Sequence, residues 1–338
     1  MTVLNIAMIG SDNLAKSIAK ASDQRDVDTY VHKENGPNGA RILSIIRPSK
    51  MPERIRPFFN SLCAAKVGLI EVQQIDAGFG EVLVGFASAG IDKGIFVINP
   101  QDGEWIDEEQ VKAFLKQAGL GNWKQCSDDG IELRGMFYGL MDEISTELEA
   151  AKSEPLVVPV DQHFNVKGIG LVAIGYVQSG SVNVHDELKL LPADGPGTVK
   201  SLQVMDDDVS EAVAGDRVGI ALRNTKEDHL TGGTIIIHPP IEDKNKGISI
   251  PLCLEKHEKS KVELTISPFQ KRRLEVGDVV HASVDLQFVV GRVESIDGDL
   301  VVNWDSPLFI RKENPPIVLI AQLDSKPRIM GSANLSRL

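Results

Sequence analysis

Long hydrophobic runs, paired cysteines and aromatic residues are all scarce in this chain of 338 residues. No apolar run approaches the roughly 20 residues of a membrane span, and the first ten residues lack the pattern of a secretion signal. The three cysteines, Cys63, Cys126 and Cys253, are far apart, which predicts no disulfide framework. Aromatic residues make up 5%, so base stacking is not expected to dominate any interface. These absences predict a cytoplasmic protein with no membrane partner.

Metal-ligand spacing and an overall basic charge are also absent. The seven histidines include no pair at helical ligand spacing, so we expect no metal site. The net charge of −12 argues against a non-specific nucleic-acid binder, and we expect no DNA partner. The charge is uneven, because residues 246–338 hold 13 basic and 12 acidic residues. Any polyanion should therefore meet the last third of the chain.

The first 152 residues alternate between apolar strand-like runs and helical segments. Such alternation requires crossover connections and predicts a mostly parallel sheet with flanking helices. The expected strands are 4–10, 28–32, 40–46, 66–73, 93–98 and 122–126, with a turn at 35–39. The expected helices are 14–22, 52–65, 76–89, 107–118 and 129–151.

The pattern changes after Ser153-Glu154-Pro155. Short β-branched runs broken by glycine and proline fill residues 153–245, which predicts a small closed antiparallel barrel. Residues 246–338 again read as all-β, after a polar, lysine-rich linker. We therefore predict a fold of the α/β plus all-β class, with domains at 1–152, 153–245 and 246–338.

The first strand leads into a loop that matches a phosphate-binding motif at all but one position. The motif G-x-x-x-x-G-K-[ST] fits Gly10, Lys16 and Ser17, but Ala15 replaces the second glycine. A Cβ there obstructs the approach of phosphates to bare backbone N–H groups. Lys16 and Ser17 are thus either remnants of a phosphate and magnesium site or surface residues of a helical turn.

Two further nucleotide motifs are also incomplete. The third strand ends in Arg47-Pro48-Ser49-Lys50, where a GTPase carries D-x-x-G. Hydrolysis also needs a side chain, such as a histidine after this motif, that positions a water for attack on the phosphate. His32 is the only histidine in residues 1–152 and it precedes the motif, so no residue is left for this role. The guanine-reading motif N-K-x-D appears as Asn99-Pro100-Gln101-Asp102, with proline in place of lysine.

Three incomplete motifs in the right order predict a GTPase-like fold without hydrolysis. We predict no catalytic residue and no cofactor, with GTP and Mg²⁺ bound only if the altered loop still accepts them. The degenerate nucleotide positions are Gly10, Lys16, Ser17, Asn99 and Asp102.

The segment from Val158 to Leu191 resembles the second domain of translational GTPases of the EF-Tu and SelB type. An acidic residue, an aromatic residue and a series of glycines stand in register, at Asp161, Phe164, Gly168, Gly170, Gly175 and Gly180. Residues 211–223 and 327–331 resemble later parts of the archaeal SelB-like elongation factors. This resemblance covers the whole chain and includes a group proposed as candidate carriers of pyrrolysyl-tRNA.

The resemblance implies an aminoacyl-tRNA partner and assigns its sites by position. Glu211 matches a glutamate that reaches the terminal adenosine, and Phe164, Val166 and Arg223 surround that 3′ end. A carboxylate suits this role because it accepts a hydrogen bond from a 2′-OH. The alternatives are a solvated turn for Glu211 and a core position for Phe164.

In the same family the third domain contacts the tRNA backbone. Two basic clusters, Lys271-Arg272-Arg273 and Arg311-Lys312, offer fixed positive charge for phosphates. The alternative is that these side chains are merely solvated. The chain stops at Leu338, so an additional C-terminal domain that reads an mRNA hairpin is not expected.

Three functions remain open at this point. The first is a monomeric, tRNA-binding elongation-factor-like protein without GTPase activity, with the ribosome as a further candidate partner. The second is a GTP- or GDP-binding factor with divergent motifs. The third is a scaffold for the ribosome or its factors that binds no tRNA.

Overall fold

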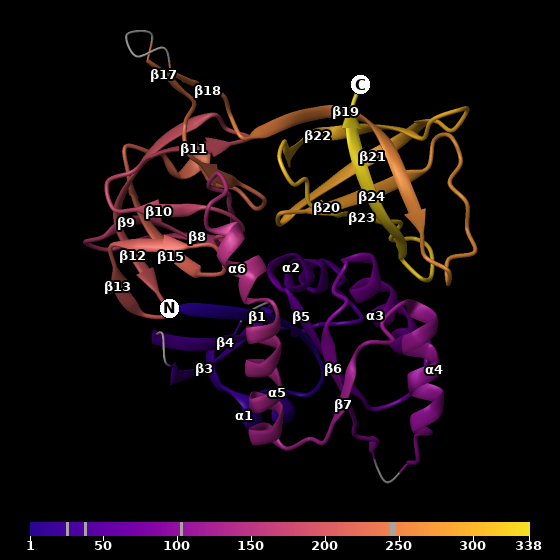
Figure 1. Ribbon diagram of the computed structural model, residues 1–338. Coiled ribbons are helices and arrows are strands. Elements are labelled where there is room, and N and C mark those ends of the chain that lie inside the picture. The colour runs from indigo at the N-terminus through magenta and orange to yellow at the C-terminus, as the bar shows by residue number, and fades with distance from the viewer. Residues whose placement is uncertain (25–26, 37–38, 102–103, 244–247) are drawn as a thin grey trace.

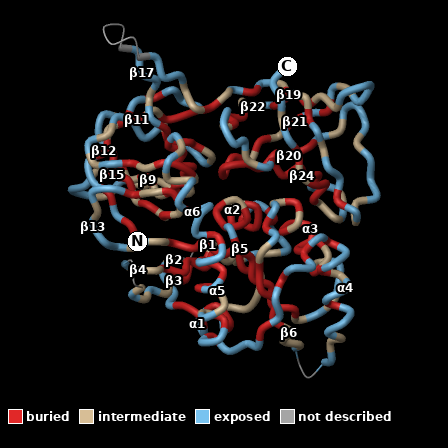
Figure 2. Tube along the Cα trace, in the orientation of Figure 1, coloured by how far each residue is buried: buried red, intermediate tan, exposed pale blue. Residues whose placement is uncertain are grey.

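The computed structural model describes residues 1–24, 27–36, 39–101, 104–243 and 248–338. The chain forms three bodies: an α/β body, a middle barrel and a last barrel (Figure 1). Among the described residues, no helix has both the length and the apolar character needed to cross a membrane. Burial follows the central strands of each body (Figure 2).

The α/β body contains one sheet in the order β2-β3-β4-β1-β5-β6-β7. Strands β4, β1, β5, β6 and β7 run parallel, and β2 and β3 add an antiparallel edge. Near-continuous apolar sequence explains the buried parallel strands. The bounds are β1 (Thr2–Ile9), β2 (Lys20–Gln24), β3 (Val27–Gly36), β4 (Gly39–Pro48), β5 (Val67–Val72), β6 (Gly94–Ile98) and β7 (Lys124–Cys126).

Helices cover both faces of this sheet. One face packs against α1 (Asp12–Ile18) and α5 (Gly130–Glu143), whose buried side chains share a core with β1 and β4. The other face packs against α2 (Arg56–Ala64), α3 (Ala77–Ser88) and α4 (Glu108–Ala118). Helix α6 (Ser145–Ala151) leads to the middle barrel. The predicted mostly parallel sheet with flanking helices is confirmed.

The middle barrel is closed by antiparallel strands in the order β11-β16-β8-β9-β15-β12, and β11 pairs back to β12. Strand β13 (Asp207–Val209) extends it, and β10 (Ser181–Asn183) pairs with β14 (Glu211–Val213) as a separate ribbon. The barrel strands are β8 (Val158–Val166), β9 (Gly170–Tyr176), β11 (Glu187–Leu191), β12 (Gly195–Val204), β15 (Arg217–Arg223) and β16 (Ile235–Ile237), and a 3-10 turn, η2 (Glu227–His229), precedes β16.

The last barrel is closed in the order β19-β22-β21-β20-β23-β24. Between the barrels, β17 (Ile241–Asp243) pairs with β18 (Ile248–Ile250) on either side of the predicted boundary at 245/246, which lies outside the described residues. The barrel strands are β19 (Leu254–Ile266), β20 (Val279–Val284), β21 (Gln287–Ser295), β22 (Val301–Arg311), β23 (Val318–Ala321) and β24 (Ile329–Arg337). The prediction of two antiparallel barrels after an α/β body is confirmed.

Several predicted helix bounds are wrong. The helix expected at 14–22 ends at Ile18, because Arg134 Nη1 donates to the carbonyls of Ser17 and Ile18, at 3.0 and 2.9 Å. Strand β2 follows in its place. The helix expected at 52–65 starts only at Arg56, with Pro57 in its first turn.

The helix expected at 129–151 is two helices. Ile144 leaves helical geometry at φ −104° and ψ 11°, and Ser145 Oγ donates to the carbonyl of Asp142 at 2.8 Å. The strand expected at 122–126 is shorter in the structure, where β7 spans only Lys124–Cys126. The predicted hairpin of β3 and β4 forms, although Pro37 and Asn38 of its turn lie outside the described residues.

Candidate functional site

The predicted phosphate loop is largely helical. Helix α1 begins at Asp12, immediately after its cap residue Ser11. The N–H of Leu14 donates to Ser11 Oγ at 3.1 Å, and the N–H of Ala15 donates to the Ser11 carbonyl at 3.2 Å. These two backbone donors therefore cap and build the helix, whereas a phosphate loop presents such donors to its ligand.

A buried carboxylate fills the space in front of this helix. Glu71 lies near the end of β5 and is 5% exposed, and its Oε2 accepts a hydrogen bond from the N–H of Ser11. Asn99, the residue expected to read guanine, donates from Nδ2 to Glu71 Oε1 at 2.7 Å. A Cβ built on Gly10 would lie 2.8 Å from Glu71 Cβ. Negative charge thus lies beside Gly10, at the start of the predicted loop.

Lys16 and Ser17 bond within their own helix. Lys16 Nζ pairs with Asp12 Oδ2 at 2.6 Å, and Ser17 Oγ donates to the carbonyl of Leu14 at 2.8 Å. Asp12 also accepts from the hydroxyl of Tyr30 at 2.6 Å. The Lys16 and Tyr30 hydrogen bonds hold the pKa of Asp12 below its usual value. Asp102, the last residue of the guanine-reading motif, lies outside the described residues.

Arg47 stands near the end of β4, in the segment where the magnesium-linked acid of a GTPase is expected. Its Nε donates to the carbonyl of Gly10 at 2.7 Å, and its Nη1 pairs with Asp28 Oδ2 at 2.8 Å. Burial raises the pKa of Asp28, and the guanidinium opposes that shift. A pocket of about 260 Å³ between the ends of β1, β4 and β5 is lined by Arg47 and Glu71. A guanidinium bonded to the loop carbonyl does not supply a metal ligand.

In the middle barrel, the predicted 3′-end residues lie on β8, β14 and β15. Val166 pairs with Gly170, next to the Leu171–Leu222 pair, so Val166 and Arg223 lie at the same end of the barrel. Phe164 lies two residues before Val166 on β8 and is half-buried.

The ribbon of β10 and β14 carries the predicted carboxylate to the same region. Glu211 is exposed and pairs with Asn183 across this ribbon. Two residues after Asn183, the ring of His185 lies 3.5 Å from the guanidinium of Arg223. The structure thus connects Arg223 to the ribbon that carries Glu211.

The predicted basic clusters differ in how much charge they offer. Lys271, Arg272 and Arg273 lie on an exposed loop between β19 and β20, where Arg272 pairs with Asp278 at 3.1 Å. Arg311 instead makes two bonds to the buried carboxylate of Asp285, at 3.2 and 3.1 Å, and its side chain is 16% exposed.

Lys312 follows Arg311 directly and is exposed. The 271–273 loop and Lys312 therefore present positive charge to solvent, while most of the charge of Arg311 is used inside the protein.

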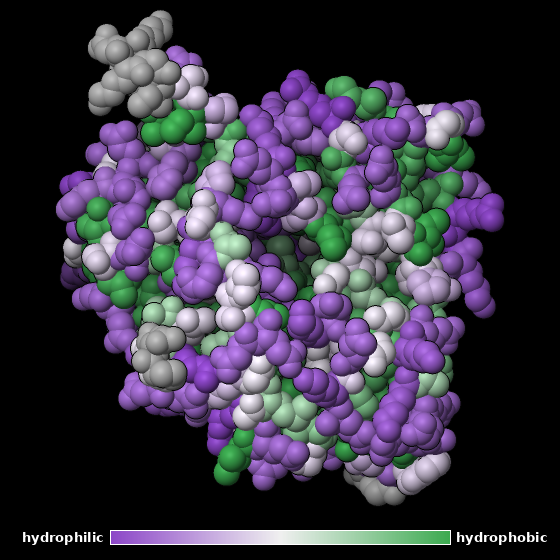
Figure 3. All heavy atoms as spheres, viewed as in Figure 1, coloured by the Kyte–Doolittle hydropathy of each residue, from purple (hydrophilic) through white to green (hydrophobic). Residues whose placement is uncertain are grey.

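A large cleft where the three bodies meet was not predicted from the sequence. It has a volume of about 1200 Å³, and basic side chains from the first and last bodies line it: Lys50, Arg54, Arg56 and Arg328. The middle barrel contributes Asp161, Gln162 and His163. Figure 3 shows the molecule hollowed between the three bodies on the face viewed. The run from Lys50 to Arg56, with three basic residues in KMPERIR, was the available sequence signal.

Asp161 is partly buried at the rim of this cleft and is held by Arg217 of β15. Arg217 Nη2 lies 3.4 Å from Asp161 Oδ2 and 3.3 Å from Asp23 Oδ2 of the first body. Burial raises the pKa of Asp161, and the neighbouring guanidinium lowers it. No group of three or more residues able to hold a metal ion occurs among the residues that the structure describes.

Comparisons with known proteins point to translation factors. Residues 170–237 match the family model of elongation factor Tu domain 2. The chain is 27% identical over 298 residues to an uncharacterized protein of Methanocaldococcus jannaschii, covering 88% of each. It is 38% identical over 123 residues to the selenocysteine-specific elongation factor of the same organism, which is 36% of this chain and 26% of that protein.

Solved structures agree with the sequence relatives. The translation elongation factor SelB from Methanococcus maripaludis, in its apo form, superimposes with a TM-score of 0.77 at 21% identity, over 100% of this chain and 80% of that one. A bacterial selenocysteine-specific elongation factor gives 0.77 at 20% identity, over 99% and 58%. The chain is therefore homologous in sequence and fold to elongation factors of the SelB and EF-Tu superfamily.

Proposed function

We propose that this protein binds an aminoacyl-tRNA and does not hydrolyse GTP. The observation that carries the proposal is the cleft of about 1200 Å³ at the junction of the three bodies. The end of a tRNA carries closely spaced phosphates, and lysine and arginine side chains supply the fixed charge that binds them. Arg56 brings such charge to the cleft from the first body, whereas Arg328 also lines the cleft but is paired with Glu81 of α3.

The 3′ end of the tRNA would lie against the middle barrel. Glu211 is exposed, and a carboxylate there accepts a hydrogen bond from the 2′-OH of a terminal adenosine. Phe164 and Val166 offer apolar surface to the base, and Arg223 offers charge to the adjoining phosphate. Lys271, Arg273 and Lys312 would contact the tRNA backbone farther along the last barrel.

The proposed absence of GTP hydrolysis rests on the side chains and backbone groups that lie where a nucleotide would bind. Glu71 places a carboxylate beside Gly10, and phosphates are repelled by like charge in a site of low dielectric. Leu14 and Ala15 use their N–H groups within α1. We propose that neither GTP nor Mg²⁺ is a cofactor, and that the protein acts as a monomer in the cytoplasm with the ribosome as a further partner.

Binding of charged and uncharged tRNA, measured by gel shift at fixed salt, tests the proposal. We expect preference for the aminoacylated form. Glu211→Ala should weaken binding about tenfold or more, because it removes a hydrogen bond to a charged acceptor. The matched control is Glu187→Ala, which removes an exposed carboxylate from β11 of the same barrel and should change nothing. Equal, weak binding of both tRNA forms would instead favour a scaffold.

Calorimetric titration with GTP and GDP in the presence of Mg²⁺ tests the proposed loss of nucleotide binding. We expect no binding at micromolar nucleotide. Micromolar, magnesium-dependent affinity would contradict the proposal and would favour a nucleotide-binding factor with divergent motifs.

A further inference from the structure

The hairpin between β20 and β21 ends in a tip, Asp285–Phe288, that reaches the place where the three bodies meet. Leu286 is 2% exposed and lies in a buried cluster with Ile46 and Ala64 of the first body and Tyr176 of the middle barrel. One side chain of the last barrel is therefore enclosed by the other two bodies.

Phe288 extends the contact along α2. Its ring centroid lies 6.0 Å from that of Phe59, and the guanidinium of Arg56 lies 5.6 Å above the ring. His281 of β20 stacks on the same ring at 5.1 Å. Phe288 is thus packed between a side chain of its own barrel and the helix of the first body.

The rest of the tip is fixed within the last barrel. Asp285 makes two bonds to Arg311 of β22. Gln287 Nε2 donates to the carbonyl of Phe309 at 2.8 Å, and the N–H of Phe309 donates to Gln287 Oε1 at 2.9 Å. These bonds hold Leu286 and Phe288 in position from behind.

The backbone of the tip is unusual for its sequence. Asp285 and Leu286 both have positive φ, at 43° and 56°, and they connect the paired residues Val284 and Gln287. A two-residue turn of this kind favours Asn-Gly, because left-handed geometry is disfavoured for a residue with a large side chain. The packing of the Leu286 side chain against the other two bodies offsets the cost of this backbone conformation.

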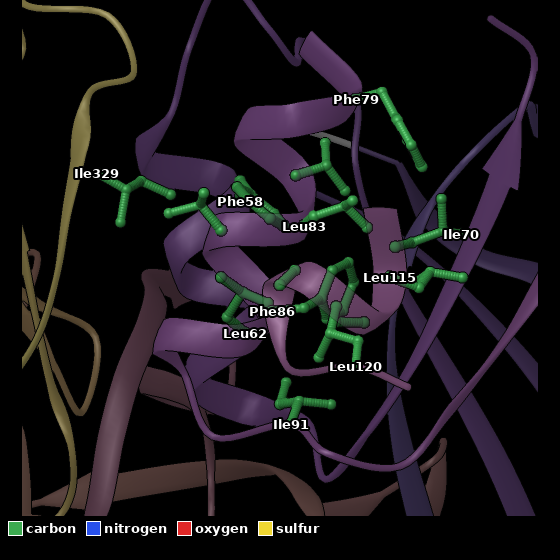
Figure 4. Packing of buried hydrophobic residues seen from close by; sticks show 14 of the residues in the cluster. Phe58, Leu62, Ile70, Phe79, Leu83, Phe86, Ile91, Leu115, Leu120 and Ile329 are labelled. Carbon is green, nitrogen blue, oxygen red and sulfur yellow. The ribbon is translucent and has the colours of Figure 1, made fainter. Parts of the chain in front are cut away.

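Further bonds join the bodies on either side of the tip. Arg328 of the last barrel donates from Nε to Glu81 Oε1 of α3 at 3.0 Å. Asn5 Nδ2 of β1 donates to the carbonyl of Gly215 in the middle barrel at 2.8 Å. Ile329 of β24 packs against α2 and α3 from the side of the last barrel, in the same buried cluster as Phe58 (Figure 4).

We propose that the tip Asp285–Phe288 locks the three bodies into one fixed arrangement that guanine nucleotides do not alter. The tip holds α2, and the ion pair of Arg217 with Asp23 holds β2, so two segments of the GTPase-like body are fixed to the barrels. A body held at both points cannot rotate against the barrels without breaking buried contacts. This inference stands independently of tRNA binding.

Single-molecule energy transfer between fluorophores tests the lock. Labels are attached through a non-natural amino acid at exposed positions in each body, Gln117, Ser201 and Asp297. We expect one distance for each pair, unchanged by GTP or GDP with Mg²⁺. Leu286→Ala should broaden or split the distribution of distances for each pair, because it removes most of the side chain that the last barrel contributes to the shared cluster.

The matched control is Leu308→Ala, which removes a fully buried leucine from the core of the last barrel alone. It should lower stability and leave the distances between bodies unchanged. If Leu286→Ala does not fold, Phe288→Leu keeps most of the apolar volume, loses the ring contacts and should give the same broadening. A shift of the wild-type distances with nucleotide, or unaltered distances in the folded tip variant, would overturn the proposal. Neither outcome bears on preference for charged tRNA, which is measured separately.

Discussion

Asp216 is a carboxylic acid that folding removes from water. It is 3% exposed in the turn between β14 and β15, where its Oδ2 accepts from the N–H of Val213 at 2.9 Å. Burial raises the pKa of Asp216 to about 6 from 3.8. Because the folded state holds this proton more tightly, the associated stability is present below pH 3.8 and is lost as the pH rises to about 6.

Asp216→Asn should remove that pH-dependent loss. Asparagine keeps an oxygen that can accept from Val213, and it has no charge to bury. At pH 7.5 we expect the variant to be more stable to unfolding by about 1–3 kcal/mol, with little difference near pH 4. Urea unfolding at several pH values measures this, with the exposed Asp297→Asn as the control. Parallel stability curves for wild type and Asp216→Asn would refute the argument.

At the residue scale, the sequence predicted which positions of the nucleotide motifs are altered. It did not predict which side chain occupies the space beside the altered loop. The change at Ala15 and the missing acid near Arg47 were visible as departures from motifs. Glu71 was not, because 60 residues separate it from Ser11 and the parallel pairing of β1 with β5 brings the two together. The predicted roles of Glu211, Arg223 and the 271–273 cluster remain predictions.

At the element scale, α5 must approach α1 closely. Gly130 begins α5, and a Cβ built there would lie 2.1 Å from the carbonyl oxygen of Ser17. Gly135, on the exposed side of the same helix, has no such neighbour within 4 Å. Gly130 therefore has no room for a side chain, whereas Gly135 of the same helix does.

Alanine substitution should separate them. Gly130→Ala should destabilise the protein by about 1–3 kcal/mol or more, because backbone must move to admit the methyl group. Gly135→Ala should stabilise it by roughly 0.5–1 kcal/mol, because alanine is the better helix former. Chemical denaturation of both variants gives the comparison. The packing argument fails if Gly130→Ala is neutral.

Element type was predictable because each segment has a clear hydrophobic period, and the α/β and barrel patterns are confirmed. Element ends were less predictable. Helix α1 stops where Arg134, more than 100 residues later, binds its last carbonyls, and no local pattern records that contact.

At the scale of the whole molecule, the cores are continuous across body boundaries. Leu319, Ala321 and Ile329 of the last barrel belong to the core of the first body. Leu254 and Phe309 share a cluster with Val157 and other residues of the middle barrel. The junction cleft follows from this arrangement, and its lining comes from distant stretches of chain, which is why the sequence did not reveal it.

Shared cores predict a single unfolding transition. Trp123 reports on the first body and Trp304 on the last, and both are buried, while Trp105 is 82% exposed. In each chain with Trp105→Phe and only one buried tryptophan retained, the fluorescence midpoint should agree within about 2 °C with the circular dichroism midpoint of the same chain. Variants with one probe each, melted alongside circular dichroism, provide the measurement. Two well-separated midpoints would show that the bodies unfold independently.

The outer strands of the α/β sheet bear on how the protein behaves at high concentration. Strand β2 has five residues and carries Lys20 and Asp23, and β7 has three, with Lys124 and Gln125 exposed. Short, polar edge strands offer a poor template for a second chain to add its backbone. Crowded preparations should therefore resist fibre growth and strand exchange through this sheet.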